Sequence, residues 1–248
     1  MNLIIRLIVR VKKDIERKKV LKNFRKEFDH FNSLDKKKRI KNEWKDIYPC
    51  LHDNTLETYF DAHYTYHPAW AARVIKKINP PLHTDISSTL HFSTIVSAFI
   101  PVDFFDYRPA NLNLSNLNSM KCDLNNLHFN SNSLESLSCM HTIEHIGLGR
   151  YGDHIDPEGD LKAIEELKRV CAPNGSLLIV VPVGIERIQF NAHRVYDPKK
   201  FVKLLHGFKL NNFSLIDDEG QFIENADLEV AASQIYGCGC FWFIKDNI

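Results

Sequence analysis

From residue 82 onward, continuous apolar runs alternate with amphipathic stretches. The run SLLIVVPVG at 176–184 is almost wholly apolar, which is typical of a strand buried on both faces. Within 157–172, Ile164, Leu167 and Val170 fall on one face of a helix. Repeated strand–helix units predict an α/β fold, with helices on both faces of a mostly parallel sheet. The expected strands are 82–86, 102–107, 120–124, 133–141, 176–184, 208–220 and 234–245, and the expected helices among them are 88–99, 157–172 and 197–207.

Two segments precede this alternating region and differ from it in composition. Residues 1–45 predict a basic amphipathic helical arm of one or two helices. Residues 46–81 are rich in aromatic side chains and are expected to form a helical cap or linker. Within it, a helix is predicted to have Pro68 near its first turn and to stop at Pro80. The α/β domain then occupies 82–248.

Charge is distributed unevenly along the chain. The formal net charge is only +1, but residues 1–41 hold 15 Lys and Arg against 5 Asp and Glu, so the remainder is acidic. Nucleic acid is therefore disfavoured as a partner, because the basic residues are confined to the arm. Four apolar residues in the arm are spaced as on one face of a helix: Ile4, Ile8, Val11 and Ile15.

This amphipathic pattern has more than one interpretation. One is an interfacial helix that binds an anionic membrane surface through residues 1–28. A helix that packs on its own domain, or on a second subunit in a homodimer, would show the same pattern. No stretch approaches the roughly 20 apolar residues of a membrane span, so the arm is not expected to cross the bilayer.

The six cysteines lack the spacing of a disulfide framework. Cys238 and Cys240 are separated by one residue, closer than the usual spacing of a zinc knuckle. The start of the chain has no small-residue cleavage site after its apolar run. The expected location is therefore the reducing cytoplasm, at the inner face of the membrane if the arm binds lipid.

Polar residues follow four of the predicted strands. They are Asp85, Asp106, Asp123 and the segment 141–145. In open α/β sheets, ligands bind where the strands end at their carboxyl side. An acidic residue about 20 positions beyond the first strand turn binds the two hydroxyls of a ribose, and Asp106 has this place relative to Asp85. The set predicts a nucleoside-shaped ligand, although any single Asp could be only a turn former.

Three longer stretches carry a resemblance to a known family. They are HTDISSTLHFSTIVSAFIPVDFFDYRP, SLSCMHTIEHIGLGRYGDHIDPEGDLKAIEELKRVCAPNGSLLIVVPVG and FNAHRVYDP. From about 82 to 244 the chain resembles class I S-adenosylmethionine-dependent methyltransferases, and more narrowly their DUF268 branch. The resemblance implies a Rossmann-like sheet with one late antiparallel strand, and S-adenosylmethionine as cofactor.

The same resemblance implies roles for individual residues. Asp85 takes the place of the acid of the first motif, and Asp106 that of the ribose-binding acid. Asp123 corresponds to the acid that approaches the adenine amino group. Met140 and His141 fall beside the methionine part of the cofactor.

One position departs from the family pattern. Glycine normally lets the first turn approach the cofactor closely, and this chain has Ser87 and Ser88 there instead. Ser87 thus becomes the candidate cofactor contact, with weakened binding expected. The departure keeps a second hypothesis open, in which a degenerate methyltransferase fold serves as a non-catalytic binding or scaffold protein.

The segment HTIEH at 141–145 also matches the H-x-x-E-H pattern of zinc peptidases. A zinc hydrolase would need His141 and His145 on one helical face, with Glu144 activating water. The preceding residues predict a strand, and Gly147 would end a helix at once. Zinc hydrolysis is therefore a remote alternative, no metal is expected, and other zinc arrangements using His141, His145 or His193 lack support from spacing.

The loop after this strand supplies candidates for acceptor chemistry. Methylation of an oxygen requires a group that removes its proton, for which a histidine is suited. Each candidate also has a structural alternative: a histidine is more often only hydrogen-bonded, and Arg150 could simply pair with Asp153. The candidate bases are His145, His193 and Glu144, and the candidate acceptor-binding residues are Arg150, Tyr151 and Arg194. The resemblance to DUF268 proteins implies a sugar or another small polar molecule of surface-glycan metabolism as the acceptor.

Overall fold

The computed structural model describes the backbone of residues 3–247 and the side chains of residues 18–247. It divides into two compact units, Met1–Tyr59 and Phe60–Ile248. The apolar face predicted from Ile4, Ile8, Val11 and Ile15 lies outside the described side chains. No helix in the described part of the chain is long and apolar enough to cross a membrane.

The first unit is built on one long helix. Helix α1 (Leu3–Leu34) is followed by the 3₁₀ helix η1 (Trp44–Asp46). The ring of Trp44 lies 5.1 Å from the ring of Phe28, and the guanidinium of Arg25 lies 4.1 Å above it. These aromatic and cation–π contacts attach the short helix to the C-terminal part of α1.

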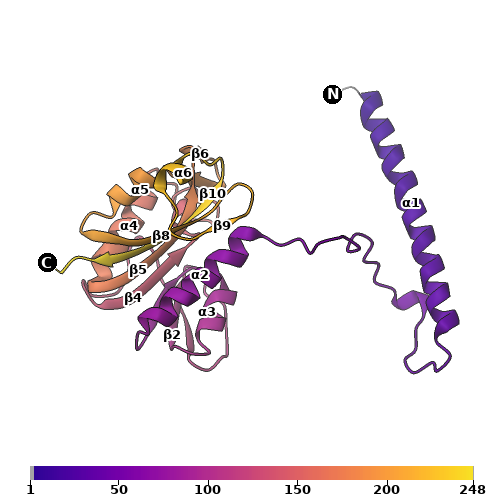
Figure 1. The fold of residues 1–248 in the computed structure, drawn as a ribbon, viewed down its shortest axis with the longest axis horizontal. Helices are drawn as coiled ribbons and strands as arrows, with labels where there is room; N and C mark the ends of the chain where they lie inside the picture. The colour runs from indigo at the N-terminus through magenta and orange to yellow at the C-terminus, as the bar shows by residue number, and fades with distance from the viewer. Residues whose placement is uncertain (1–2, 248) are drawn as a thin grey trace. The chain divides into compact units, whose positions relative to one another are not determined.

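The second unit contains an eight-stranded sheet in the order β3-β2-β1-β4-β5-β10-β8-β9 (Figure 1). Strands β1 to β5 pair in parallel, whereas β10 runs antiparallel to both β5 and β8. The α/β prediction with a mostly parallel sheet and a late antiparallel strand is thus confirmed. The strands are β1 (His83–Ile86), β2 (Val102–Asp106), β3 (Leu117–Lys121), β4 (Leu134–Met140), β5 (Cys171–Val183), β8 (Phe208–Ile216), β9 (Phe222–Ile223) and β10 (Gly237–Lys245), with a separate hairpin of β6 (Arg187–Gln189) and β7 (His193–Val195).

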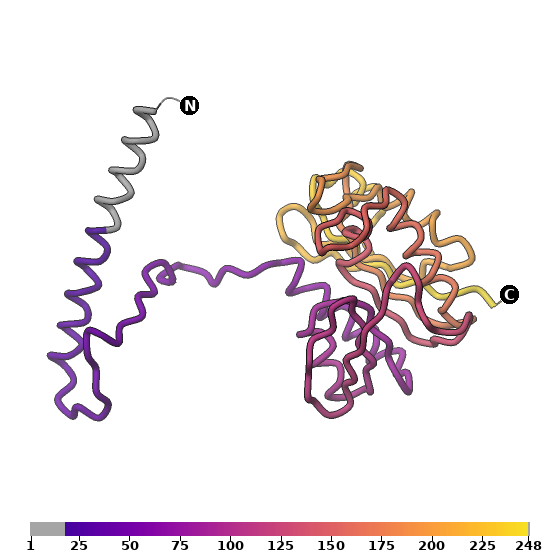
Figure 2. The backbone as a smooth tube through the Cα atoms, turned by 180° about the vertical axis from the view of Figure 1, so that it is seen from behind, coloured from indigo at the N-terminus to yellow at the C-terminus, as the bar shows by residue number. Residues whose placement is uncertain are grey.

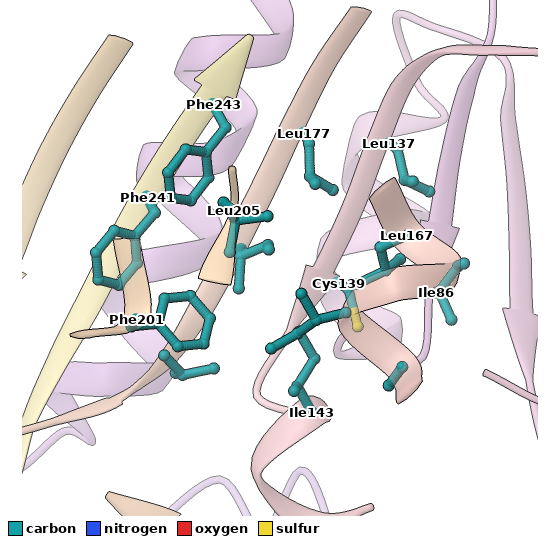
Figure 3. Close-up of a cluster of buried hydrophobic side chains, with 14 of the residues drawn as sticks. Ile86, Leu137, Cys139, Ile143, Leu167, Leu177, Phe201, Leu205, Phe241 and Phe243 are labelled. Carbon is teal, nitrogen blue, oxygen red and sulfur yellow. The ribbon is translucent and has the colours of Figure 1, made fainter. Parts of the chain in front are cut away.

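Helices cover both faces of this sheet. On one face, α2 and α3 enclose a core that includes Trp70, Phe92 and Val180. On the other face, α4 and α5 enclose a core that includes Leu167 and Phe201, with side chains from β1, β4, β5 and β10 (Figure 3). Seen from the opposite side, the yellow C-terminal strand lies within the body of this unit (Figure 2). The helices are α2 (Ala62–Ile78), α3 (Leu90–Val96), α4 (Gly159–Val170), α5 (Pro198–Leu204) and α6 (Leu228–Ala232).

Several elements differ from the sequence predictions, and strand β5, for example, begins at Cys171 instead of at residue 176. Helix α2 begins at Ala62 instead of near Pro68, because the Asp61 side chain caps it by accepting the backbone N–H of Tyr64. Strand β3 lies three residues earlier than expected, after Asn116 turns the chain with a φ of +60°. Four short elements were not predicted from the sequence, because none of them is longer than five residues: the strands β6 and β7 of the hairpin, strand β9 and helix α6.

The topology brings four strand ends together. Strand β1 lies between β2 and β4, and it pairs with both in parallel. The chain order reverses direction here, because β2 and β3 extend the sheet on one side of β1 and β4 and β5 extend it on the other. Such a switch point is where open α/β sheets bind ligands, so the carboxyl ends of β1 to β4 locate the site.

Candidate functional site

A cavity of about 580 Å³ lies at the carboxyl ends of the first four strands. Four of the residues singled out from the sequence line it, one from each strand end: Ser87, Asp106, Asp123 and His141. The loop after β4 contributes His145 and Tyr151. Segments far apart in the sequence thus meet around one space, as the prediction from the strand ends requires.

The first turn retains a glycine-like backbone although it has no glycine. Ser87 has a φ of +56°, in the left-handed region that glycine adopts most readily. Its N–H donates to the carbonyl of Phe105 at 2.7 Å, and its own carbonyl accepts from the Thr142 hydroxyl at 2.9 Å. These bonds hold the turn between the ends of β2 and β4.

The neighbouring Ser88 has a different role. Its side chain is buried, and its hydroxyl accepts the backbone N–H of Met140 at 3.1 Å. Ser88 is not among the residues that line the cavity. The Ser88 hydroxyl therefore points into the protein interior and does not occupy space in the cavity.

Two carboxylates border the cavity at neighbouring strand ends. Asp106 Oδ1 accepts the N–H of Arg108 at 2.7 Å, and Asp123 Oδ1 accepts the N–H of Asn125 at 2.9 Å. Each Asp side chain thus stabilises a local turn, which is the structural role considered as the alternative to ligand binding. This use of Oδ1 leaves Oδ2 as the atom available to a ligand in the cavity.

Asp85 and Met140 lie behind the cavity wall instead of in it. Asp85 is fully buried, where it accepts hydrogen bonds from the hydroxyls of Ser93 and of Ser138. Burial raises its pKa to about 6, against the opposing effect of these serine donors. Met140 is packed in the core beneath α2 and α3. Direct cofactor contact was expected of both residues, but neither lines the cavity because β1 and β4 direct them into the interior.

The loop that leaves β4 is held in a tight conformation. Asp153 accepts the backbone N–H groups of Gly147, Gly149 and Tyr151. Gly147 has a φ of +80°, and a Cβ there would lie 2.0 Å from the carbonyl oxygen of Asp156, so this turn requires glycine. Asp153 thus shapes the loop through backbone donors, and the expected pair with Arg150 is not formed, because Arg150 donates to the carbonyl of Ala192 instead.

His145 is fixed at the inner edge of this loop. Its Nδ1 donates to the carbonyl of Ala192 at 2.6 Å, which leaves Nε2 as the unprotonated nitrogen of the neutral ring. Arg150 donates to the same carbonyl at 3.1 Å, and its guanidinium lies 5.1 Å above the ring of Tyr151. Arg108 lies 5.2 Å from that ring as well, so two guanidinium groups border Tyr151.

Three further candidates do not line the cavity: the acceptor-binding residues Arg150 and Arg194, and the candidate base His193. Arg194 is buried, where its guanidinium lies 3.4 Å from Asp160 and donates to the carbonyl of Ile146 at 2.7 Å. His193 donates from Nε2 to Gln189 within the β6–β7 hairpin. Burial lowers the pKa of His193, while the nearby Glu144 opposes this shift. Arg194 therefore supports the loop from beneath, and His193 lies beside the site.

The H-x-x-E-H segment does not form a zinc-hydrolase site. Residues Ile143–His145 form the 3₁₀ helix η2, so His141 and His145 do not share an α-helical face. His141 Nδ1 is paired with Glu144 Oε1 at 2.7 Å, whereas His145 Nδ1 is bound to a backbone carbonyl. Glu144 is buried with His141 and does not line the cavity, so a general-base role for it is not supported by its position.

Two histidines of helix α2 pack against His141. His63 and His67 of α2 lie with their rings 5.8 Å and 5.0 Å from the ring of His141. Burial lowers the pKa of His63 to about 4 and that of His67 well below its ordinary value. Both rings are therefore neutral near pH 7. This cluster was not expected from the sequence, because its members are far apart along the chain.

Several cavity residues were also missed. Tyr107 and Arg108 directly follow Asp106, so their place beside the cavity could have been inferred from the strand end. Lys162 reaches the cavity from helix α4 and forms an ion pair with Asp156 at 2.6 Å. No sequence signal separates Lys162 from the other lysines of that helix.

A family model described as "Caenorhabditis protein of unknown function, DUF268" matches residues 110–234, which is half of the chain. The chain belongs to the DUF268 family. The matched part of this DUF268 protein includes Asp123, His141 and His145, whereas Ser87 and Asp106 precede it. No curated protein matches the chain.

Solved structures share the fold of the DUF268 protein at low sequence identity. A Bacillus halodurans protein assigned as a methyltransferase has a TM-score of 0.52 at 12% identity, covering 72% of this chain and 98% of its own. The N-methyltransferase NodS of Bradyrhizobium japonicum has a TM-score of 0.52 at 11% identity, covering 75% and 98%. At such identities the likeness shows the fold alone, which is that of class I S-adenosylmethionine-dependent methyltransferases.

Proposed function

We propose that this DUF268 protein is an S-adenosylmethionine-dependent methyltransferase that uses the cavity at the ends of β1 to β4. One observation carries the proposal. Asp106 and Asp123 border a single cavity of about 580 Å³ beneath a left-handed turn at Ser87, at the switch point of a methyltransferase fold. Fold alone would not suffice, because one fold hosts many functions.

The residues present fit this cofactor. The cavity volume is within the roughly 300–1,000 Å³ typical of small-molecule sites. Asp106 Oδ2 can accept from a ribose hydroxyl, and Asp123 Oδ2 can accept from an adenine amino group. The cofactor supplies a methyl group on a positively charged sulfur. Four acidic residues border the cavity against Arg108 and Lys162, so its charge suits a cation: Asp106, Asp123, Asp153 and Asp156.

His145 is the base that the geometry favours. Its Nδ1–H is held by the Ala192 carbonyl, so Nε2 carries the lone pair, and the residue lines the cavity. A hydroxyl acceptor placed in the cavity would lose its proton to Nε2. Tyr151, bordered by Arg108 and Arg150, offers a flat face and two cations for a polar acceptor such as a sugar.

Calorimetry on the full-length protein tests the proposal. We expect S-adenosylmethionine and S-adenosylhomocysteine to bind, and Asp106→Ala to weaken both by more than about tenfold, since a charged hydrogen-bond acceptor is lost. Asp103→Ala is the matched control, because Asp103 lies on the same strand and pairs with Asn118 outside the cavity. Absence of binding at millimolar cofactor would overturn the enzyme proposal and favour the binding or scaffold protein.

A further inference from the structure

Three metal-ligating side chains meet just after strand β4, and only one of them, His141, also lines the cavity. One ligand atom from each of His63, His141 and Cys238 lies within 4.8 Å of the others. Cys238 Sγ and His141 Nε2 are 3.4 Å apart. In a tetrahedral site with Zn–N near 2.05 Å and Zn–S near 2.3 Å, the two ligand atoms would be about 3.6 Å apart. The pair therefore already has the separation that a shared zinc ion requires.

The hydrogen bonds of His141 orient it as a metal ligand. Its Nδ1 lies 2.7 Å from Oε1 of the buried Glu144, so Nδ1 carries the proton and Nε2 faces Cys238. A carboxylate that accepts the Nδ1–H of a metal-binding histidine is the usual second layer of zinc sites. This role as the acceptor of the His141 Nδ1–H would also explain why the Glu144 carboxylate is buried next to a histidine.

A second histidine, His67, also has its proton on Nδ1, and its Nε2 makes no hydrogen bond among the described residues. His67 is fully buried, and its Nδ1 donates to the carbonyl of His63 at 2.6 Å. Its Nε2 is buried and has no hydrogen-bond partner among the described residues. An unsatisfied buried nitrogen is costly. His67 packs against His141, with the ring centroids 5.0 Å apart, but it lies outside the group of three whose ligand atoms are within 4.8 Å of one another.

We propose that His63, His141 and Cys238 bind a zinc ion. Two imidazoles and one thiolate are ligands that zinc prefers. Binding forms a Zn–S bond as the proton of the Cys238 thiol leaves to solvent. His63 is only partly buried, which gives the ion a route from solvent.

The ion would connect three separate elements. His63 lies in the first turn of α2, His141 follows β4, and Cys238 lies in β10. Zinc would therefore fasten the start of α2 to the sheet next to the turn that holds Ser87. This role does not depend on cofactor binding, so the site can be tested on its own.

Cobalt replaces zinc as a spectroscopic probe. The full-length, tag-free protein is stripped with a chelator, exchanged into metal-free buffer and titrated with Co²⁺. We expect one ion per chain, with the visible bands of a tetrahedral site and a near-ultraviolet band from thiolate-to-cobalt charge transfer. Zinc affinity is then measured by competition with a chromophoric chelator, and melting is followed with and without Zn²⁺.

Paired variants assign the ligands. Cys238→Ser should abolish the charge-transfer band and weaken zinc binding by more than about a hundredfold, beyond the 10–100-fold typical of second-layer changes. Cys50→Ser is the matched control, because this cysteine is exposed and lies in the first unit. His63→Ala should weaken zinc binding, whereas His52→Ala, at an exposed histidine, should not.

Three results would overturn the proposal. They are a wild-type protein without the charge-transfer band, a Cys238→Ser variant with unchanged zinc affinity, and a band that disappears with Cys240→Ser and persists in Cys238→Ser. Far-ultraviolet circular dichroism checks folding. If Cys238→Ser does not fold, His63→Ala decides the question, because His63 is partly exposed and its loss leaves the core intact.

Discussion

At the scale of single residues, Ser87 and Ser88 are neighbours with opposite roles. Ser87 adopts a left-handed φ of +56°, which a side chain disfavours by roughly 1 kcal/mol relative to glycine. Ser88 uses its buried hydroxyl to satisfy the N–H of Met140. We therefore expect Ser87→Gly to raise the free energy of unfolding by about 0.5–1 kcal/mol. Ser88→Gly should lower it by about 1–3 kcal/mol, because a buried donor loses its partner. Urea denaturation of both variants measures the change in the free energy of unfolding. If the two variants change it in the same direction, this explanation of the turn is wrong.

A second residue-scale prediction concerns the buried Asp85. Its pKa is raised from 3.8 to about 6, mainly by burial, so the folded protein holds a proton that the unfolded chain has released. The contribution of this group to stability is therefore present below about pH 4 and lost as pH rises through about 6. Across that window the wild type should lose about 2–3 kcal/mol relative to Asp85→Asn, since one pKa unit corresponds to about 1.4 kcal/mol. Denaturation of both proteins at a series of pH values gives the difference between their free energies of unfolding. A difference that does not change with pH would show that Asp85 does not titrate in this range.

The site illustrates which residues a sequence can reveal. Asp106 and Asp123 were predictable, because each follows a recognisable strand, and strand ends meet at a switch point. Asp85 and Met140 are also at strand ends, but the last residues of a strand alternate between its two faces, and the sequence does not say which side chain faces the ligand. The cluster of His63, His141 and Cys238 was not predictable, since only the folded chain brings these three together.

At the scale of elements, two arginines with different surroundings contact the loop after β4 and the β6–β7 hairpin. Arg194 is buried against Asp160 and backbone carbonyls, whereas Arg150 is exposed and donates to one carbonyl. Arg194→Ala should destabilise the protein by about 3–5 kcal/mol, because it leaves the Asp160 charge buried without its partner. Arg150→Ala should change stability by less than about 0.5 kcal/mol. Thermal and urea unfolding distinguish the two, and equal effects would show that Arg194 does not support the loop.

Long elements were easier to predict than short ones. The buried strand β5 and the amphipathic helix α4 have strong apolar patterns, and both lie close to their expected positions. Helix α2 was predicted to start six residues too late, because Pro68 resembles a start signal and the cap at Asp61 precedes an aromatic stretch with weak periodicity. The β6–β7 hairpin has three residues in each strand, too few for a pattern to stand out.

At the scale of the whole molecule, the two units differ in net charge. Residues 1–41 carry 15 Lys and Arg against 5 Asp and Glu, and the rest of the chain has an acidic excess. An anionic membrane surface would attract the first unit and repel the second, each within about a Debye length. The sequence alone suffices to predict this asymmetry, since it depends on composition and not on packing.

Vesicle sedimentation tests the membrane interpretation of the arm. The full-length chain should sediment with vesicles that contain phosphatidylserine, less so at high salt, and not with neutral phosphatidylcholine vesicles, because the attraction is electrostatic. Reversing Lys18, Lys19 and Lys22 to Glu should weaken binding by more than about a hundredfold, since each basic residue near such a surface contributes about 1 kcal/mol. The matched control reverses the exposed Lys76, Lys203 and Lys209 of the second unit and should leave binding unchanged. If both triple variants bind alike, the arm does not contact lipid. The basic helix would then have to pack on protein, and sedimentation equilibrium would show whether that protein is a second copy of the chain.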